Sequence, residues 1–140
     1  MSEPEVLVDT SVAVSLVVSD HSHHAQAVRA LRGRRLGLSG HASFETFSVL
    51  TRMPPPARRP PAVVAELLAV NFPATRFLSP SAAKALMDRF AGGEIAGGAV
   101  YDALVGAVAA EYGLTLVTLD RRALETYRLL GIEVEVLPSS

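Results

Sequence analysis

The stretch EVLVDTSVAVSLVV, residues 5–18, contains the transition that decides the fold. Residues 5–8 contain the apolar run Val6–Val8 and are typical of a short buried strand, which Asp9 ends. Thr10 or Ser11 is then expected to cap a helix, because a side-chain oxygen can accept a hydrogen bond from a free N–H of the first turn. A strand that passes directly into a helix indicates an α/β fold.

The same alternation continues to the end of the chain. Further strands are predicted at 36–39, 76–78, 114–118 and 133–137, and further helices at about 22–32, 42–53, 61–70, 79–90 and 122–130, with one more around Asp102. Strands that alternate with helices indicate a parallel sheet covered on both faces. We therefore expect a three-layer α/β/α sandwich around a short, mostly parallel sheet of four or five strands, with 133–137 at an edge.

The composition is that of one globular domain. Of the 140 residues, 49% are hydrophobic and 19% are charged, which is enough apolar material for a substantial core. Because the chain has no cysteine, disulfides, thiolate metal sites and cysteine nucleophiles are excluded. The start MSEPEVLVDTS has neither the basic nor the apolar region of a signal peptide, and no apolar run is long enough to span a bilayer. We expect a single domain over residues 1–140 and a cytoplasmic location.

Positive charge is concentrated in one part of the chain. The formal net charge is −1, but between His21 and Ala65 seven arginines stand against one acid, Glu45. That segment is net +6 (seven minus one), which leaves −7 for the rest. Since the planar guanidinium group suits phosphate, a polyanionic partner is one explanation, and an ordinary solvated face is the other.

Four acids in apolar surroundings form the candidate site: Asp9, Glu45, Asp102 and Asp120. Asp9 and Asp120 follow predicted strands, and sites in parallel α/β folds form at the carboxyl ends of strands. Two unit charges 4 Å apart repel by about 4 kcal/mol at an effective dielectric near 20, so an ionised cluster requires a compensating cation. Mg²⁺ or Mn²⁺ suits carboxylate ligands and can activate a water that attacks a phosphodiester.

Each acid also has a structural explanation. Asp9 and Asp120 could cap the helices that follow them, and Glu45 could pair with a surface arginine. Asp102 lies in GGAVYDALVGAVAA, residues 97–110, in which it is the one group charged at neutral pH. We expect it to be buried, because a helix that is apolar on every side is normally buried, and its own helix offers no cationic partner.

The order of these motifs resembles that of the PIN-domain family. The segments VDTSV, SFETFSVL, GGAVYDALVGAVA and LVTLDRRA resemble those of the VapC-type toxins of bacterial type II toxin–antitoxin pairs, and the resemblance covers essentially the whole chain. It implies a metal-dependent endoribonuclease that uses Mg²⁺ or Mn²⁺ to hydrolyse RNA phosphodiester bonds. It also implies a homodimer and a cognate antitoxin protein that inhibits the enzyme.

The resemblance further implies roles for individual residues. The four acids match the family's catalytic and metal-binding acids, in the order Asp9, Glu45, Asp102 and Asp120. Small hydroxyl positions beside them, which orient carboxylates or water, are matched by Thr10, Ser11 and Thr118. RNA contacts are expected from a basic rim of Arg29, Arg32, Arg52, Arg58 and Arg59. The family often has a phenylalanine shortly after the fourth acid, where this chain has Ala123 and Leu124, so direct metal binding by Asp120 stays open.

Other kinds of site fit the residues less well. The histidines of DHSHH, residues 20–24, have no cysteine partners and are predicted to be surface groups rather than a zinc site. The glycines of GGEIAGG, residues 92–98, do not follow a strand as a dinucleotide-binding loop would, and GHASFE, residues 40–45, is not a nucleophile elbow. Two alternatives stay open: a PIN-fold RNA- or protein-binding module without catalysis, and an aspartate-based phosphate-handling protein in which Asp9 is phosphorylated. Ser11 stands where such phosphatases carry a second acid.

Overall fold

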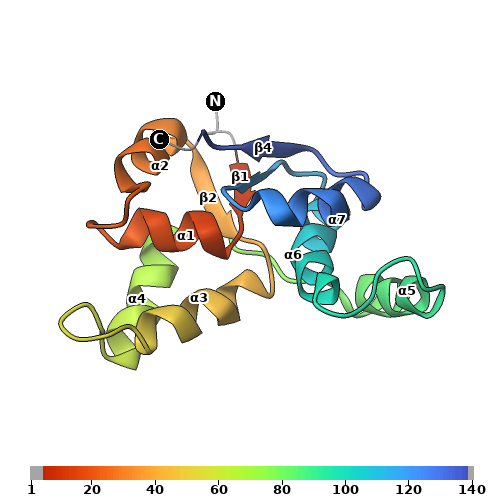
Figure 1. The fold of residues 1–140 in the computed structure, drawn as a ribbon, viewed down its shortest axis with the longest axis horizontal. Helices are drawn as coiled ribbons and strands as arrows, with labels where there is room; N and C mark the ends of the chain where they lie inside the picture. The colour runs from red at the N-terminus through yellow and green to blue at the C-terminus, as the bar shows by residue number, and fades with distance from the viewer. Residues whose placement is uncertain (1–4, 139–140) are drawn as a thin grey trace.

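A parallel sheet with the strand order β2-β1-β3-β4 forms the centre of the fold (Figure 1). The computed structural model describes residues 5–138, and in this range the strands are β1 (Glu5–Val8), β2 (Arg35–Leu38), β3 (Leu116–Thr118) and β4 (Val134–Val136). All three strand pairings are parallel. The predicted α/β class is confirmed, and β4 lies at an edge as expected.

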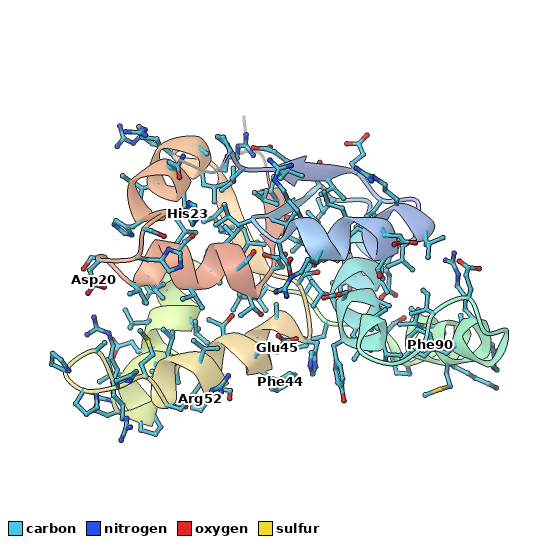
Figure 2. All side chains as sticks on the ribbon, viewed as in Figure 1. Asp20, His23, Phe44, Glu45, Arg52 and Phe90 are labelled. Atoms are coloured by element: carbon cyan, nitrogen blue, oxygen red, sulfur yellow. The ribbon has the colours of Figure 1, made fainter. Side chains whose placement is uncertain are left out.

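Helices connect the strands. Within residues 5–138 they are α1 (Thr10–Val17), α2 (His24–Leu31), α3 (Ala42–Thr51), α4 (Pro61–Asn71), α5 (Pro80–Ala91), α6 (Ala99–Tyr112), the short 3₁₀ helix η1 (Arg121–Ala123) and α7 (Leu124–Leu129). Helix α5 stands apart from α3 and α4, with Phe90 and Arg52 on opposite sides of the molecule (Figure 2). None of these helices has the length and hydropathy that crossing a bilayer requires.

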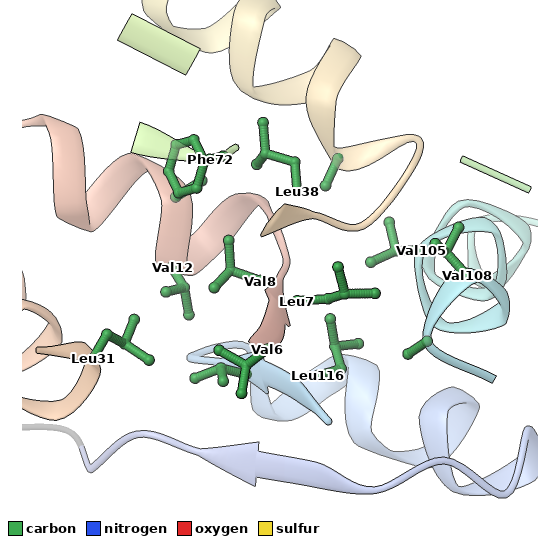
Figure 3. Close-up of a cluster of buried hydrophobic side chains, with 14 of the residues drawn as sticks. Val6, Leu7, Val8, Val12, Leu31, Leu38, Phe72, Val105, Val108 and Leu116 are labelled. Atoms are coloured by element: carbon green, nitrogen blue, oxygen red, sulfur yellow. The ribbon is translucent and has the colours of Figure 1, made fainter. Parts of the chain in front are cut away.

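The buried side chains of β1 divide between the two faces of the sheet, because successive residues of a strand point in opposite directions. Leu7 points toward Val105 of α6, whereas Val8 points toward the side on which Val12 of α1 lies (Figure 3). Leu7, Val8 and Val12 are fully buried. The sheet is therefore the middle layer of a three-layer α/β/α sandwich, as predicted.

The prediction of a strand at residues 76–78 was wrong. Arg76 makes only an isolated parallel bridge to Ser39 beyond the end of β2. The hydroxyl of Thr75 accepts a hydrogen bond from the backbone N–H of Leu38 at 2.9 Å, so a side chain satisfies a donor that a further strand would use. The segment then turns into α5, which Ser79 caps, and too few residues remain for a strand.

The strand order reverses at β1, which lies between β2 and β3. In open α/β sheets, sites form at the carboxyl ends of the strands at such a reversal, because the connections leave in opposite directions there. Asp9 directly follows β1, and Asp120 is two residues beyond the end of β3. The fold thus places these two acids at the edge of the sheet where a site is expected.

Candidate functional site

Asp9 is held by four hydrogen-bond donors at the carboxyl end of β1. Its Oδ1 accepts hydrogen bonds from the Ser11 hydroxyl at 2.5 Å and from the Val12 backbone N–H at 3.3 Å. Its Oδ2 accepts hydrogen bonds from the Thr118 hydroxyl and, at 3.1 Å, from the Tyr127 hydroxyl. The residue is only 4% exposed, so burial and four donors together fix the orientation of this carboxylate.

Asp9 is also the N-cap of α1, which was its structural explanation in the sequence, and the prediction of Thr10 or Ser11 as the cap was wrong. Its backbone is extended, and its carboxylate accepts the Val12 N–H of the first turn. Thr10 lies inside the helix, and its Oγ1 is buried without a hydrogen-bond partner among the described residues. Capping uses only Oδ1, so it does not compete with a role in a site.

The hydroxyls beside Asp9 join β1 to the loop after β3. Ser11 Oγ accepts a hydrogen bond from the Leu119 N–H at 3.0 Å, and Thr118 Oγ1 accepts one from the Asp120 N–H at 2.9 Å. Both hydroxyls donate to Asp9 at the same time. The backbone of Asp120 is therefore positioned relative to the carboxylate of Asp9 by two hydroxyl bridges.

The charge of Asp9 has no fixed positive partner. Burial raises the pKa of Asp9 above its ordinary value, and the hydrogen bonds from Ser11, Thr118, Val12 and Tyr127 act in the opposite direction. In residues 5–138 no lysine, arginine or histidine forms an ion pair with it. The carboxylate is stabilised by dipoles alone, which leaves its charge available to a bound cation.

Asp102 is half-buried, not buried as its apolar surroundings predicted. It lies in the first turn of α6, directly after Tyr101, which is 57% exposed. The buried part of the helix begins only at Ala103, because the first turn extends beyond the core. The helix dipole stabilises a carboxylate in the first turn, so a charge here costs less free energy than a fully buried one would.

The other three candidate acids act on Asp102. Desolvation raises the pKa of Asp102 most, followed by the negative charges of Asp120, Glu45 and Asp9, in that order. The positive charge of Arg122 acts in the opposite direction. The structure therefore brings Asp9, Glu45 and Asp120 within range of the charge of Asp102, from the ends of β1 and β3 and the first turn of α3.

Glu45 and Asp120 each have a neighbouring basic group. The Glu45 Oε1 atom lies 3.4 Å from Nε2 of His41, four residues earlier in the chain. Asp120 Oδ1 accepts a hydrogen bond from the Arg122 backbone N–H at 3.0 Å and lies 3.6 Å from its Nε. Figure 2 shows Glu45 at the end of α3 nearest to α6. Both side chains are partly exposed, so these two contacts are screened by solvent and weak.

These side chains do not form a closed metal cage. Over residues 5–138, no group of three or more His, Cys, Asp or Glu side chains lies close enough together to hold an ion as it stands. The donor set nevertheless fits a hard divalent cation, because it consists of carboxylate oxygens with an excess of negative charge around Asp102. Mg²⁺ commonly binds through one or two carboxylates and keeps several waters, so the remaining acids can contact those waters.

Tyr127, His41 and Arg122 are site residues that the sequence motifs did not reveal. Tyr127 is 1% exposed and donates its hydroxyl to Asp9 across 118 positions of sequence. Burial is the main reason that the pKa of its phenol is raised, and the charge of Asp9 adds to this, so Tyr127 stays a donor at all working pH values. Of the three residues, only Arg122 could have been found from the sequence, because the pair Arg121–Arg122 directly follows the fourth acid.

The arginines predicted to contact RNA lie away from the acids. Arg29 belongs to α2 and Arg32 follows it, before the amino end of β2, whereas the acids lie beyond carboxyl ends of strands. Arg52 lies at the end of α3 that is remote from Glu45 (Figure 2), and Arg58 and Arg59 follow in the loop before α4. All five are exposed.

Known proteins similar to this chain agree in family and fold. The PIN domain family model matches residues 6–129. Ribonuclease VapC27 of Mycobacterium tuberculosis (strain ATCC 25618 / H37Rv) is 46% identical over 134 residues, which cover 96% of this chain and 98% of that protein. Ribonuclease VapC40 of the same species (strain CDC 1551 / Oshkosh) is 45% identical over 131 residues, covering 92% and 96%.

Solved structures with the same fold are more distant in sequence. The crystal structure of Mycobacterium tuberculosis VapC20, described as a sarcin-ricin loop cleaving toxin, matches with a TM-score of 0.67 at 20% identity and covers 95% of this chain and 99% of that one. The DNA-bound VapBC of Salmonella typhimurium matches with a TM-score of 0.65 at 19% identity, covering 96% and 98%. At these identities the likeness shows the fold alone.

Proposed function

The chain belongs to the PIN-domain family, and from this we infer that it is a VapC-type toxin, an endoribonuclease that hydrolyses RNA phosphodiester bonds. The observation that carries the inference is the buried, dipole-held carboxylate of Asp9, together with the charges of Asp120, Glu45 and Asp9 that act on Asp102. Curated relatives named as VapC ribonucleases share 45–46% of their residues with it over nearly its whole length. A binding module without catalysis would have no need for this accumulation of like charge.

The phosphorylated-aspartate alternative is disfavoured by the geometry of Asp9. A nucleophilic carboxylate must expose an oxygen to the phosphorus atom. Both oxygens of Asp9 instead accept hydrogen bonds from protein groups, and the residue is almost completely buried. Its negative charge can still act on a cation bound nearby.

Asp9, Glu45, Asp102 and Asp120 would hold Mg²⁺ or Mn²⁺, directly or through the ion's waters. When bound, such an ion supplies the Lewis acidity that activates water and offsets the charge of the phosphodiester. Ser11, Thr118 and Tyr127 keep the Asp9 carboxylate in one orientation, and Thr10 lies beside them. Asp102 is half-buried, so a water held by the ion could reach its carboxylate oxygens.

The proposed partners are RNA and an antitoxin protein. Two of the solved structures that share the fold are VapBC complexes, one from Salmonella typhimurium and one from Rickettsia felis. By analogy, a cognate antitoxin would inhibit this chain. A homodimer, a cytoplasmic location and a single domain over residues 1–140 remain predictions of the sequence.

The proposal predicts cleavage that depends on added metal. Purified chain incubated with a short single-stranded RNA should cut it when Mn²⁺ or Mg²⁺ is present and should stop when the ion is removed with EDTA, because the four acids would then repel the phosphate. Denaturing gel electrophoresis of end-labelled RNA measures the products. Equal cleavage with and without EDTA, or binding without cleavage under both conditions, would contradict the assignment.

Arg121 and Arg122 are expected to contribute more to RNA binding than the arginines predicted from the sequence, because they adjoin the acids and are exposed. The double variant Arg121→Ala/Arg122→Ala should reduce the slope of log affinity against log salt concentration by about 0.7 for each phosphate that the protein ceases to neutralise. Arg29→Ala/Arg32→Ala is the matched control, since it removes the same charge from the opposite end of the sheet. Fluorescence anisotropy with labelled RNA over a salt series measures both. A larger effect in the control would place the RNA on α2 instead.

A further inference from the structure

Four aromatic rings gather on the surface beside the acids: His41, Phe44, Phe77 and Tyr101, here called the aromatic platform. They come from the start of α3, the segment before α5 and the first turn of α6. Phe44 is 63% exposed, Tyr101 57% and Phe77 49%. Scattered apolar side chains on a surface are ordinary, but a contiguous group of large exposed rings marks a binding site.

The rings form a continuous chain. The centroids of Tyr101 and His41 are 5.6 Å apart and the rings are stacked, with planes inclined by 28°. His41 and Phe44 are 6.3 Å apart, and Phe44 and Phe77 are 5.9 Å apart, both in tilted arrangements. A surface pocket of about 220 Å³ opens between three of the rings, His41, Phe44 and Phe77, and has Leu104 on its wall.

The aromatic platform is continuous with the candidate active site at two points. His41 Nε2 lies 3.4 Å from the Glu45 carboxylate, and Tyr101 directly precedes Asp102 in the first turn of α6. Figure 2 shows Phe44 and Glu45 next to each other at the same end of α3. A ligand whose reacting group lies among the acids would therefore have its adjoining part over these rings.

We propose that the aromatic platform binds an unstacked RNA base that neighbours the cleaved phosphodiester. This proposal rests on the proposed function, since it assigns part of the substrate of that same site. Nucleobases stack on aromatic side chains, and every base offers such a face, so the contact recognises an unpaired base without reading its sequence. A base inside a duplex is already stacked on its neighbours, so the aromatic platform restricts cleavage to unpaired positions.

The test measures binding with cleavage switched off. All variants carry Asp102→Asn, and the probe is a series of short single-stranded RNAs in which one position at a time is 2-aminopurine or abasic. Phe44→Leu and Tyr101→Leu should weaken binding by roughly 5- to 150-fold, the range for losing one base–aromatic stack. The conservative Phe44→Tyr should bind as the parent does. Met87→Ala, which removes an exposed apolar side chain on α5, is the control and should have no effect.

A specific stack has two further signatures. One 2-aminopurine position should lose fluorescence on binding to the parent and keep it with Phe44→Leu. At that position the abasic RNA should bind the parent and Phe44→Leu equally, because the base has no ring left to contact. If Phe44→Leu and Tyr101→Leu bind every probe as tightly as the parent, the aromatic platform is not a base site.

Other outcomes separate this proposal from the proposed function. If the chain with Asp102 intact cuts RNA with Mn²⁺ and the ring variants cut equally well, the nuclease assignment stands and the base site is overturned. If the intact chain neither binds nor cuts RNA, the proposed function itself fails. Size-exclusion chromatography at a fixed concentration completes the test: a dimer that becomes a monomer in Phe44→Leu would show that a second copy covers these rings, which overturns the base site.

Discussion

Asp102→Asn is expected to abolish metal-dependent RNA cleavage while the chain stays folded. The substitution keeps the shape of the side chain but removes the charge on which the other three acids act. Losing a residue that only orients a metal ligand typically costs about 10- to 100-fold in activity, so losing the charge of a metal-binding acid itself should cost more. Single-turnover cleavage of end-labelled RNA in Mn²⁺ measures the effect.

Tyr127→Phe provides a graded comparison for Asp102→Asn. It deletes one hydroxyl from the surroundings of Asp9 and leaves the buried ring in place. Because Ser11, Thr118 and the Val12 N–H still hold the carboxylate, activity should fall by no more than about 10- to 100-fold. Equal losses of activity in both variants would show that orientation of Asp9, rather than the charge at Asp102, limits the reaction.

Without metal, Asp102→Asn should unfold at the same temperature as the parent or a higher one. The folded-state pKa of Asp102 is raised above its ordinary value, so the ionised carboxylate opposes folding at neutral pH. That opposition disappears as the pH falls through the interval between the raised and the ordinary pKa, because the carboxyl then binds a proton. The two melting temperatures should therefore converge on acidification. A variant much less stable than the parent at pH 7 would instead identify Asp102 as part of a structural ion pair.

Secondary structure was predictable where the signal was local. The run at residues 5–8 and the acid after it determine both the strand and the cap of the next helix, and the structure has both. Residues 76–78 contain the apolar pair Phe77–Leu78, but only Arg76 forms a bridge, because the Thr75 hydroxyl occupies the Leu38 N–H. Which group satisfies a backbone donor depends on tertiary packing, and a single sequence does not contain that information.

The site residues, too, were predictable from local sequence but not where they depend on tertiary packing. Asp9 and Asp120 were identifiable because each follows a strand, and Asp102 because it is a charge in an apolar run. The predicted full burial of Asp102 was wrong, since the sequence does not show how far α6 extends beyond the core. Tyr127 was not identifiable, because its contact with Asp9 depends on how α7 packs and not on a nearby motif. The acids can be identified from their local sequence, whereas the groups that orient them are determined by packing.

Gly37→Ala is expected to destabilise the fold by about 1–3 kcal/mol or more, the usual cost of adding atoms to a filled core. A Cβ at this position of β2 would lie 2.2 Å from the carbonyl oxygen of Ala74, 2.4 Å from its carbon and 2.8 Å from the Thr75 nitrogen. These are backbone atoms and cannot rotate away. The Ala74 N–H donates to the Leu36 carbonyl at 2.9 Å and the Thr75 hydroxyl accepts from the Leu38 N–H at 2.9 Å, so moving this segment breaks bonds to β2.

The matched control is Gly98→Ala, which adds the same methyl group where nothing lies within 4 Å. Its φ of −62° suits alanine, so its stability should stay within about 0.5 kcal/mol of the parent. Urea unfolding followed by circular dichroism measures both variants. Because the added methyl group would meet Ala74 and Thr75 and none of the four acids, the folded fraction of Gly37→Ala should retain cleavage, and its activity should fall only as far as its folded population does. Equal stability of the two variants would mean that residues 74–75 do not lie against β2.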